Sequence, residues 1–185
     1  MPPAGLLGRV PHRRQAHIYS EAELVALLEQ ASRLLPRRGL RPRTYVAFFS
    51  LLAATGLRLS EACRLERGDV DLDAGVLTIR EGKFRKSRLV PLHPSATEAL
   101  ARYAADRDGC CDAGGTGCFF RTERAPALTA AAVEKTFSRI RAAAGLDRGG
   151  TGVPAAHPRI CRLVRYADLE EKALLRAFSG VEVSA

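Results

Sequence analysis

The residue with the clearest chemical demand in this sequence is Arg58, which directly follows an apolar stretch, residues 45–57. The surrounding segment, LLAATGLRLSEACRL at residues 51–65, predicts two helices joined at Gly56. A guanidinium beside a core costs several kcal/mol unless a partner satisfies it. Two partners fit Arg58: the carboxylate of Glu61, one helical turn further along, or an anion that arrives from outside.

A hairpin with a basic tip follows Arg58. Residues 76–80 and 88–92 are rich in β-forming residues, and the loop between them, EGKFRKS, is polar. Five basic side chains lie in this loop or at its ends: Arg80, Lys83, Arg85, Lys86 and Arg88. An arginine offers a planar fork for two phosphate oxygens, and a lysine on a hairpin tip can protonate a leaving oxygen. Together they predict phosphoryl-transfer chemistry on a nucleic-acid backbone.

The net charge of the chain is concentrated in two segments. The 185 residues hold 29 Lys and Arg against 20 Asp and Glu, a formal charge of +9. Residues 1–45 contribute +5 and residues 79–92 contribute +4, so the rest of the chain is balanced. Two positive zones on a neutral body predict a polyanionic partner, namely nucleic acid. The competing explanation is an arginine-rich composition without a binding role.

Composition also excludes several classes of protein. Five cysteines make an odd count without a CxxC pair, which argues against a disulfide framework and a structural zinc site. The first residues lack the apolar core of a signal peptide. The longest apolar run, residues 45–57, is too short to span a bilayer. The sequence therefore predicts a cytoplasmic protein with no metal, no cofactor and no membrane partner.

Hydrophobic periodicity predicts an α+β fold that is mainly helical, a helical bundle with one small antiparallel β-sheet or hairpin. Residues 20–23, SEAE, form a capping box that opens a first helix. Residues 44–55 are apolar nearly all round and predict a central, buried helix, which a short helix follows. Residues 95–98 predict a second capping box at the start of another helix, and Thr129 caps a last one.

These pieces, in this order and at this spacing, resemble the catalytic domain of tyrosine recombinases, the phage integrase family. The segment ATGLRLSEACRLERGDVDL resembles the family's first arginine box, and GVLTIREGKFRKSRLVPLHPSATEAL resembles its hairpin with the catalytic lysine. CFFRTERAPALTAAAVEKTFSRIRAAAGL is similar to the stretch before its second box. The resemblance covers roughly residues 17–150. It implies cleavage of DNA through a tyrosine, with a 3′-phosphotyrosine link and no metal.

The resemblance also implies roles by position. Arg58 would hold the scissile phosphate, and Glu61 would orient Arg58 or brace its helix. Lys83 would be the general acid toward the leaving 5′ oxygen. The other basic residues of the hairpin would contact DNA: Arg80, Arg85, Lys86 and Arg88. Members of the family assemble as tetramers on DNA through their C-terminal end, and the divergent end of this chain leaves its own oligomeric state open.

The C-terminal part departs from the family's pattern. The second box reads H-x-x-R-H, and His157 lies at a suitable distance from Arg58, but Ile160 stands where the arginine belongs. A second register puts Val164 at that position. Tyr166 is the one tyrosine after residue 150 and is the candidate nucleophile. Neither register supplies the second arginine.

We therefore divide the chain into a basic arm or linker (residues 1–18), a partial catalytic domain (19–155) and a divergent tail (156–185). Three functions fit this division. An active recombinase needs a second arginine and a placed tyrosine. An incomplete recombinase domain would bind DNA without cutting and rejoining it, and the departures favour this function. An unrelated basic helical DNA-binding module or regulator leaves the lysine hairpin unexplained.

Overall fold

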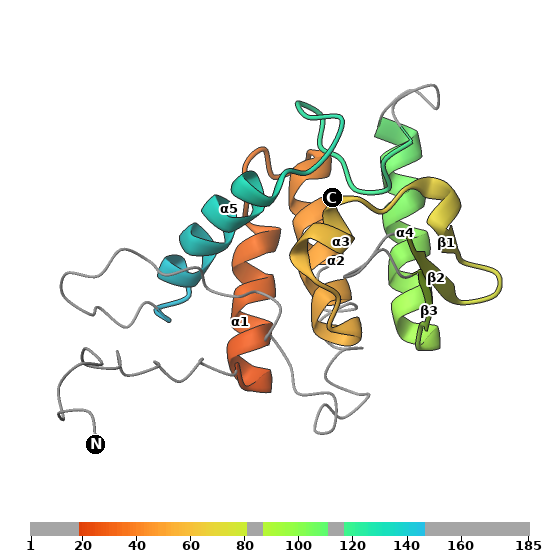
Figure 1. Cartoon of the computed structure of the whole chain (residues 1–185). Coiled ribbons are helices and arrows are strands. Elements are labelled where there is room, and N and C mark those ends of the chain that lie inside the picture. Colours follow the sequence, from red (N-terminus) through yellow and green to blue (C-terminus); the bar gives the residue numbers. More distant parts are fainter. Residues whose placement is uncertain (1–18, 81–86, 111–116, 147–185) are drawn as a thin grey trace, which may run out of the picture.

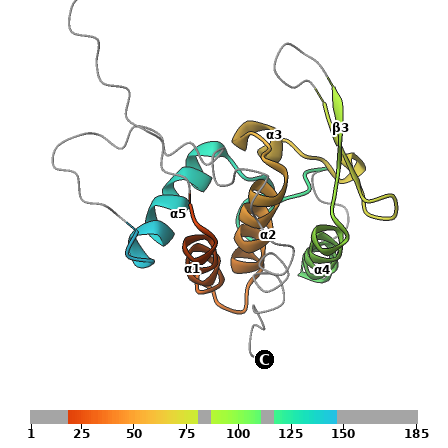
Figure 2. The same ribbon diagram turned by 90° about the horizontal axis from the view of Figure 1, so that it is seen from below.

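A row of helices with one small sheet makes up the fold of this chain, shown in Figure 1. The computed structural model describes residues 19–80, 87–110 and 117–146. The elements in these ranges are α1 (Glu21–Ser32), α2 (Leu40–Thr55), α3 (Leu59–Cys63), η1 (Arg67–Asp69), β1 (Val70–Asp71), β2 (Val76–Ile79), β3 (Arg88–Pro91), α4 (Pro94–Cys110) and α5 (Ala130–Ala143). Figures 1 and 2 show α5, α1, α2 and α4 in this spatial order. The predicted fold class is confirmed.

Helix α2 is the centre of the core, as its apolar sequence predicts. It packs against α1, α3 and α4, and its side chains are buried nearly all round. Phe48 stacks edge-on against Phe120, with ring centroids 5.1 Å apart, and Phe49 lies 5.5 Å from Phe137. These aromatic contacts join α2 to the segment before α5 and to α5 itself.

The start of α2 is four residues earlier than residue 44, where the sequence pattern places it. Pro42 falls in the first turn of the helix, where no intrahelical partner exists for its missing N–H. The Glu123 carboxylate, from the loop before α5, accepts hydrogen bonds from the backbone N–H groups of Leu40 and Arg41. This cap comes from more than 80 residues away, so local pattern does not reveal it.

The sheet has the order β1-β2-β3 and is antiparallel throughout. Val76 pairs with Pro91 and Ile79 pairs with Arg88, so β2 and β3 form the predicted hairpin. The turn before β2 ends at Gly75, whose φ of 65° is the left-handed conformation that glycine tolerates best. Leu77 and Ile79 point into the core, which fixes the face of the sheet that packs on the helices.

Two of the three predicted helix caps are confirmed. Ser20 and Glu23 form the capping box of α1, and Thr129 caps α5. The second capping box, at residues 95–98, is wrong. Helix α4 begins at Pro94, so Ser95 lies inside the first turn, and its backbone N–H donates to His93 Nδ1 at 3.3 Å. Proline is well suited to the first helical position, so the helix starts at Pro94 and His93 is the residue directly before it. The imidazole of His93 therefore takes the capping role.

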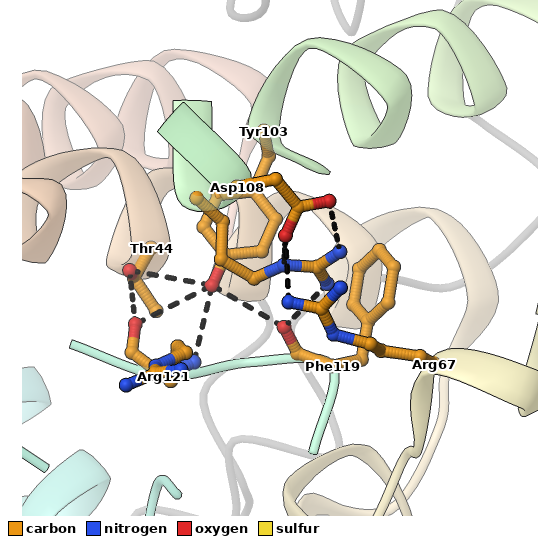
Figure 3. A network of polar contacts seen from close by, with 7 residues as sticks. Thr44, Arg67, Tyr103, Asp108, Phe119 and Arg121 are labelled. Atoms are coloured by element: carbon orange, nitrogen blue, oxygen red, sulfur yellow. Dashed lines mark hydrogen bonds and ion pairs between the residues drawn. The ribbon is translucent and has the colours of Figure 1, made fainter. Parts of the chain in front are cut away.

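A polar network fixes α4 to the segment before α5 (Figure 3). The Tyr103 hydroxyl accepts a hydrogen bond from the Arg121 backbone N–H at 3.1 Å. The buried Arg107 donates to the Phe119 carbonyl at 3.1 Å and to the Asp108 carboxylate at 2.8 Å. Asp108 also pairs with Arg67 of η1 at 2.6 Å. The network therefore joins three parts of the chain that are distant in sequence.

Several predicted features lie outside the described residues. They are the arm at 1–18, the tail at 156–185 and four candidate site residues: Lys83, Arg85, Lys86 and His157, together with the candidate nucleophile Tyr166. The boundaries of the three predicted segments stay predictions. Over residues 19–80, 87–110 and 117–146, no helix has the length and apolar character needed to cross a bilayer.

Candidate nucleic-acid interface

Arg58 owes its position to the turn between α2 and α3. Gly56 ends α2 in the left-handed conformation, with φ of 60°, and its N–H donates to the Leu52 carbonyl at 2.9 Å. The next side chain, Leu57, is fully buried and anchors the turn. Arg58 follows as the N-cap residue of α3, and 49% of its side chain is exposed. The turn therefore holds Arg58 at the surface and not in the core.

The Glu61 carboxylate binds two arginines. Its side chain is only 5% exposed, and Oε1 accepts from Arg58 Nη1 at 2.9 Å while Oε2 accepts from the Arg58 backbone N–H at 3.0 Å. Arg88, the first residue of β3, donates with both terminal nitrogens, at 3.1 Å to Oε1 and 2.8 Å to Oε2. Glu61 thus links the helix that begins after Arg58 to the base of the hairpin.

The four hydrogen bonds keep Glu61 charged. Burial by itself would raise the pKa of this carboxyl group, but the hydrogen bonds from Arg88 and from the Arg58 backbone, the charge of Arg88 and the hydrogen bond from the Arg58 side chain lower it from 4.5 to about 2. At neutral pH one carboxylate therefore faces two guanidiniums. The cluster keeps one surplus positive charge on a half-exposed surface.

Strand β2, the other strand of the hairpin, is followed by a similar contact between an arginine and a buried carboxylate. Arg80, directly after β2, places Nε 2.5 Å from Oδ1 of Asp69, whose side chain is 5% exposed. Asp69 is itself held in place, since its Oδ2 accepts from the Glu66 backbone N–H at 3.0 Å. Asp69 and Glu61 therefore fix the two described ends of the hairpin loop, one on each strand. The anchoring role of Asp69 is one that the sequence analysis missed.

The sequence gives two possible partners for Arg58, the Glu61 carboxylate and an external anion. The structure leaves room for both at once. Glu61 holds Nη1, yet half of the side chain remains exposed. In the described part of the chain, Nε and Nη2 of Arg58 make no hydrogen bond. These donors are available to a planar anion such as a phosphate. For Arg80 and Arg88, DNA contact stays a prediction, and both use their guanidiniums on carboxylates in this structure.

The described residues near Arg58 offer neither a metal site nor an activated thiol. No group of His, Cys, Asp and Glu within residues 19–80, 87–110 and 117–146 is arranged to hold a metal ion. Burial raises the pKa of Cys63, on the same short helix as Glu61, from 9.0 to about 11. Its thiol keeps its proton at neutral pH and is a poor nucleophile.

Comparison with known proteins decides the family. The model of the phage integrase family matches residues 19–163, which include every described residue. This chain belongs to the phage integrase family. Among its relatives is "Putative integrase/recombinase y4rE" of Sinorhizobium fredii (strain NBRC 101917 / NGR234), 44% identical over 134 residues. That match covers 72% of this chain and 43% of the relative.

Solved structures of phage integrase family members share the fold. The crystal structure of XerA recombinase matches with a TM-score of 0.59 and 26% identity, over 80% of this chain and 48% of that one. XerH recombinase bound to a palindromic difH substrate, a post-cleavage complex, matches with a TM-score of 0.58 and 26% identity. That match covers 78% of this chain and 39% of XerH. The chain therefore spans less than half the length of these family members.

Proposed function

We propose that this chain binds the phosphate backbone of DNA through the surface around Arg58, as part of a tyrosine recombinase catalytic domain. The observation that carries the proposal is the Glu61 cluster, in which one buried carboxylate orients two arginines and leaves Arg58 half exposed. A guanidinium held on one side by a carboxylate is pre-organised to bind a phosphate on the other. The structural neighbour XerH, solved with its difH substrate, supports DNA as the partner.

Lys83 completes the proposed chemistry. It belongs to the loop whose two ends are fixed by Asp69 and Glu61, through Arg80 and Arg88. As the general acid, it would give a proton to the 5′ oxygen that leaves when the phosphodiester is cut. Arg58 would stabilise the negative charge that develops on the phosphate. Both roles come from the family and are assigned here by position.

We further propose that the chain binds DNA but does not exchange strands. Charge on the reacting phosphate must be held from more than one side, and neither Ile160 nor Val164 can replace the second arginine. Family membership disfavours the alternative of an unrelated DNA-binding module. The formation of tetramers on DNA stays a proposal for this chain.

The binding proposal is tested by replacing Arg58 and a neighbouring arginine separately. Arg64 lies at the end of the short helix that Arg58 caps and is exposed, and among the described residues its side chain donates only to the Ser60 carbonyl. Arg64→Ala therefore removes the same charge. Loss of a charge-assisted bond to phosphate should make Arg58→Ala bind a DNA duplex about tenfold more weakly in fluorescence anisotropy. Arg64→Ala should lose about twofold or less. Equal losses in the two variants would show that Arg58 contributes only its charge to the overall field.

A further inference from the structure

A second basic surface lies at the connection between α1 and α2. It consists of four arginines, which we call the turn surface: Arg33, Arg37, Arg38 and Arg41. The first three are exposed and Arg41 is partly exposed. Among the residues that the structure describes, none of the four guanidiniums pairs with a carboxylate, and the one acidic contact in the set is that of the Arg41 backbone N–H with Glu123. They belong to the positive zone at residues 1–45, which the proposed function does not use.

The turn surface is held in shape by contacts of its own. The Gly39 N–H donates to the Pro36 carbonyl at 3.0 Å, and Arg41 Nη1 donates to the Leu35 carbonyl at 3.0 Å. The Arg41 guanidinium also lies over the ring of the buried Tyr45, 5.6 Å from its centroid. A turn fixed in this way presents its charges with little further loss of entropy on binding.

The acidic residues close to this turn do not neutralise it. Glu123 is engaged by the backbone N–H groups at the start of α2, and Asp106 pairs with Arg43 at 3.1 Å. Glu29 is exposed on the last turns of α1 and makes no ion pair within the described residues. Because Glu123 already occupies the N-terminus of α2, an incoming anion would meet guanidiniums and not free backbone amides.

The turn surface and the Arg58 surface lie on opposite sides of the molecule. In Figure 2 the connection between α1 and α2 lies at the lower edge of the helix row, and α3 with the end of β3 that points away from α4 lies at the upper edge. The 16 residues of α2 separate the two surfaces, and a helix of that length spans about 24 Å. This exceeds the Debye length of about 8 Å at physiological salt, so the two surfaces can bind anions independently.

We propose that the turn surface binds the phosphates of a second DNA duplex, without sequence preference, so that one chain can hold two duplexes. Guanidiniums match phosphate oxygens in geometry and charge. An acidic protein partner fits less well, because a protein interface needs an apolar core and the exposed apolar side chains within this turn are only Leu35 and Pro36. Bridging of two duplexes goes beyond the proposed binding of one duplex at Arg58.

The experiment measures capture of a labelled duplex by protein bound to a second, immobilised duplex. The turn variant carries Arg33→Ala, Arg37→Ala and Arg38→Ala, and it leaves Arg41, which packs on Tyr45, in place. A control variant removes the same charge from exposed positions of α4 and α5, with Arg102→Ala, Lys135→Ala and Arg139→Ala. The turn variant should lose at least about tenfold in capture and the control about twofold or less. The salt slope of capture should fall by about 3 in the turn variant.

A further arm separates this proposal from the proposed function. The hairpin variant, with Lys83→Ala, Arg85→Ala and Lys86→Ala, weakens the Arg58 surface. Its remaining affinity for a single duplex should disappear when the turn substitutions are added.

Wild-type protein that captures no second duplex, or a turn variant that captures as well as the control, would overturn the proposal. Polyglutamate that binds wild-type protein but not the turn variant, without reducing capture of the second duplex, would also overturn the proposal and would indicate an acidic protein partner. Failure of the first binding step alone would instead contradict the proposed function.

Discussion

Glu61 contributes to folding as well as to the proposed site, because its charge is buried between two guanidiniums. A fall in pKa from 4.5 to about 2 corresponds to about 3 kcal/mol of stability at neutral pH. Glu61→Gln keeps the shape of the side chain but removes the charge. We expect this variant to unfold with a free energy lower by about that amount, since both arginines then lack a counter-ion.

The stability that Glu61→Gln loses depends on pH in a definite direction. A carboxyl group whose pKa is lower in the folded state stabilises the fold above its unfolded pKa of 4.5 and loses that effect as the pH falls toward 2. Urea denaturation should therefore show the full difference between wild type and Glu61→Gln at pH 7 and a shrinking difference between pH 4.5 and 2. Glu98→Gln, at an exposed position of α4, is the matched control and should change stability by less than about 0.5 kcal/mol. A difference that stays constant across this range would contradict the role of the charge.

Single residues differ in how far the sequence predicts them. Glu61 is one helical turn from Arg58, so spacing alone identifies it as a candidate partner. The contact between Glu61 and Arg88 spans 27 residues and depends on the register of β2 and β3. No local pattern contains that register. The sequence identifies Arg80 and Arg88 as basic hairpin residues. Their carboxylate partners are distant in sequence and are visible only in the structure.

At the scale of elements, the attachment of α4 to the segment before α5 depends on the Tyr103 hydroxyl group in the polar network. The Tyr103 side chain is 3% exposed, and its oxygen accepts from the Arg121 N–H and lies 3.3 Å from the Arg121 carbonyl. Tyr103→Phe leaves this buried N–H without its partner, which costs about 1–3 kcal/mol. Tyr45→Phe is the control, because Tyr45 is equally buried but its hydroxyl makes one long contact, 3.5 Å to the Ala132 carbonyl. Chemical denaturation should show a smaller loss for Tyr45→Phe, and equal losses would show that the network is not important for stability.

The elements that the sequence predicts well are those with local signals. Capping residues identify the starts of α1 and α5, and alternation with a turn identifies the hairpin. The start of α2 is missed, and no local signal marks the end of α4, because distant groups stabilise both. Glu123 caps α2, and α4 continues to Cys110, past the last residues with a helical pattern. The buried Arg107 stabilises that last part through the Phe119 carbonyl.

At the scale of the whole molecule, charge and family together limit the function. The net charge of +9 lies in two segments, and the described parts of these segments contribute to surfaces at opposite ends of α2. The described part contains the first arginine box and the base of the lysine hairpin, both within the family match. The candidates for the second arginine box and the nucleophile, His157 and Tyr166, lie outside the described residues.

The last prediction is that the chain forms no covalent adduct with DNA. One donor to the developing charge is typically worth ~10²–10³ in rate, and Arg58 supplies only one side. Arg159, Arg162 and Arg165 lie near the position of the second arginine in sequence. On a helix, however, a shift of one residue turns a side chain by about 100° and moves it away from the phosphate. Tyr166 directly follows the altered box, whereas the family separates the box from its nucleophile by several helical segments.

A nicked suicide substrate traps the covalent intermediate because the released strand diffuses away. We expect denaturing gel electrophoresis to show free protein only, under salt conditions where anisotropy shows that the same duplex is bound. Binding in the absence of an adduct is the combination that an incomplete recombinase domain produces, since Arg58 needs no nucleophile to hold a phosphate. An adduct that forms with wild-type protein and disappears in Tyr166→Phe would contradict the prediction. It would identify Tyr166 as the nucleophile, and one of the three nearby arginines would then have to supply the second side of the phosphate.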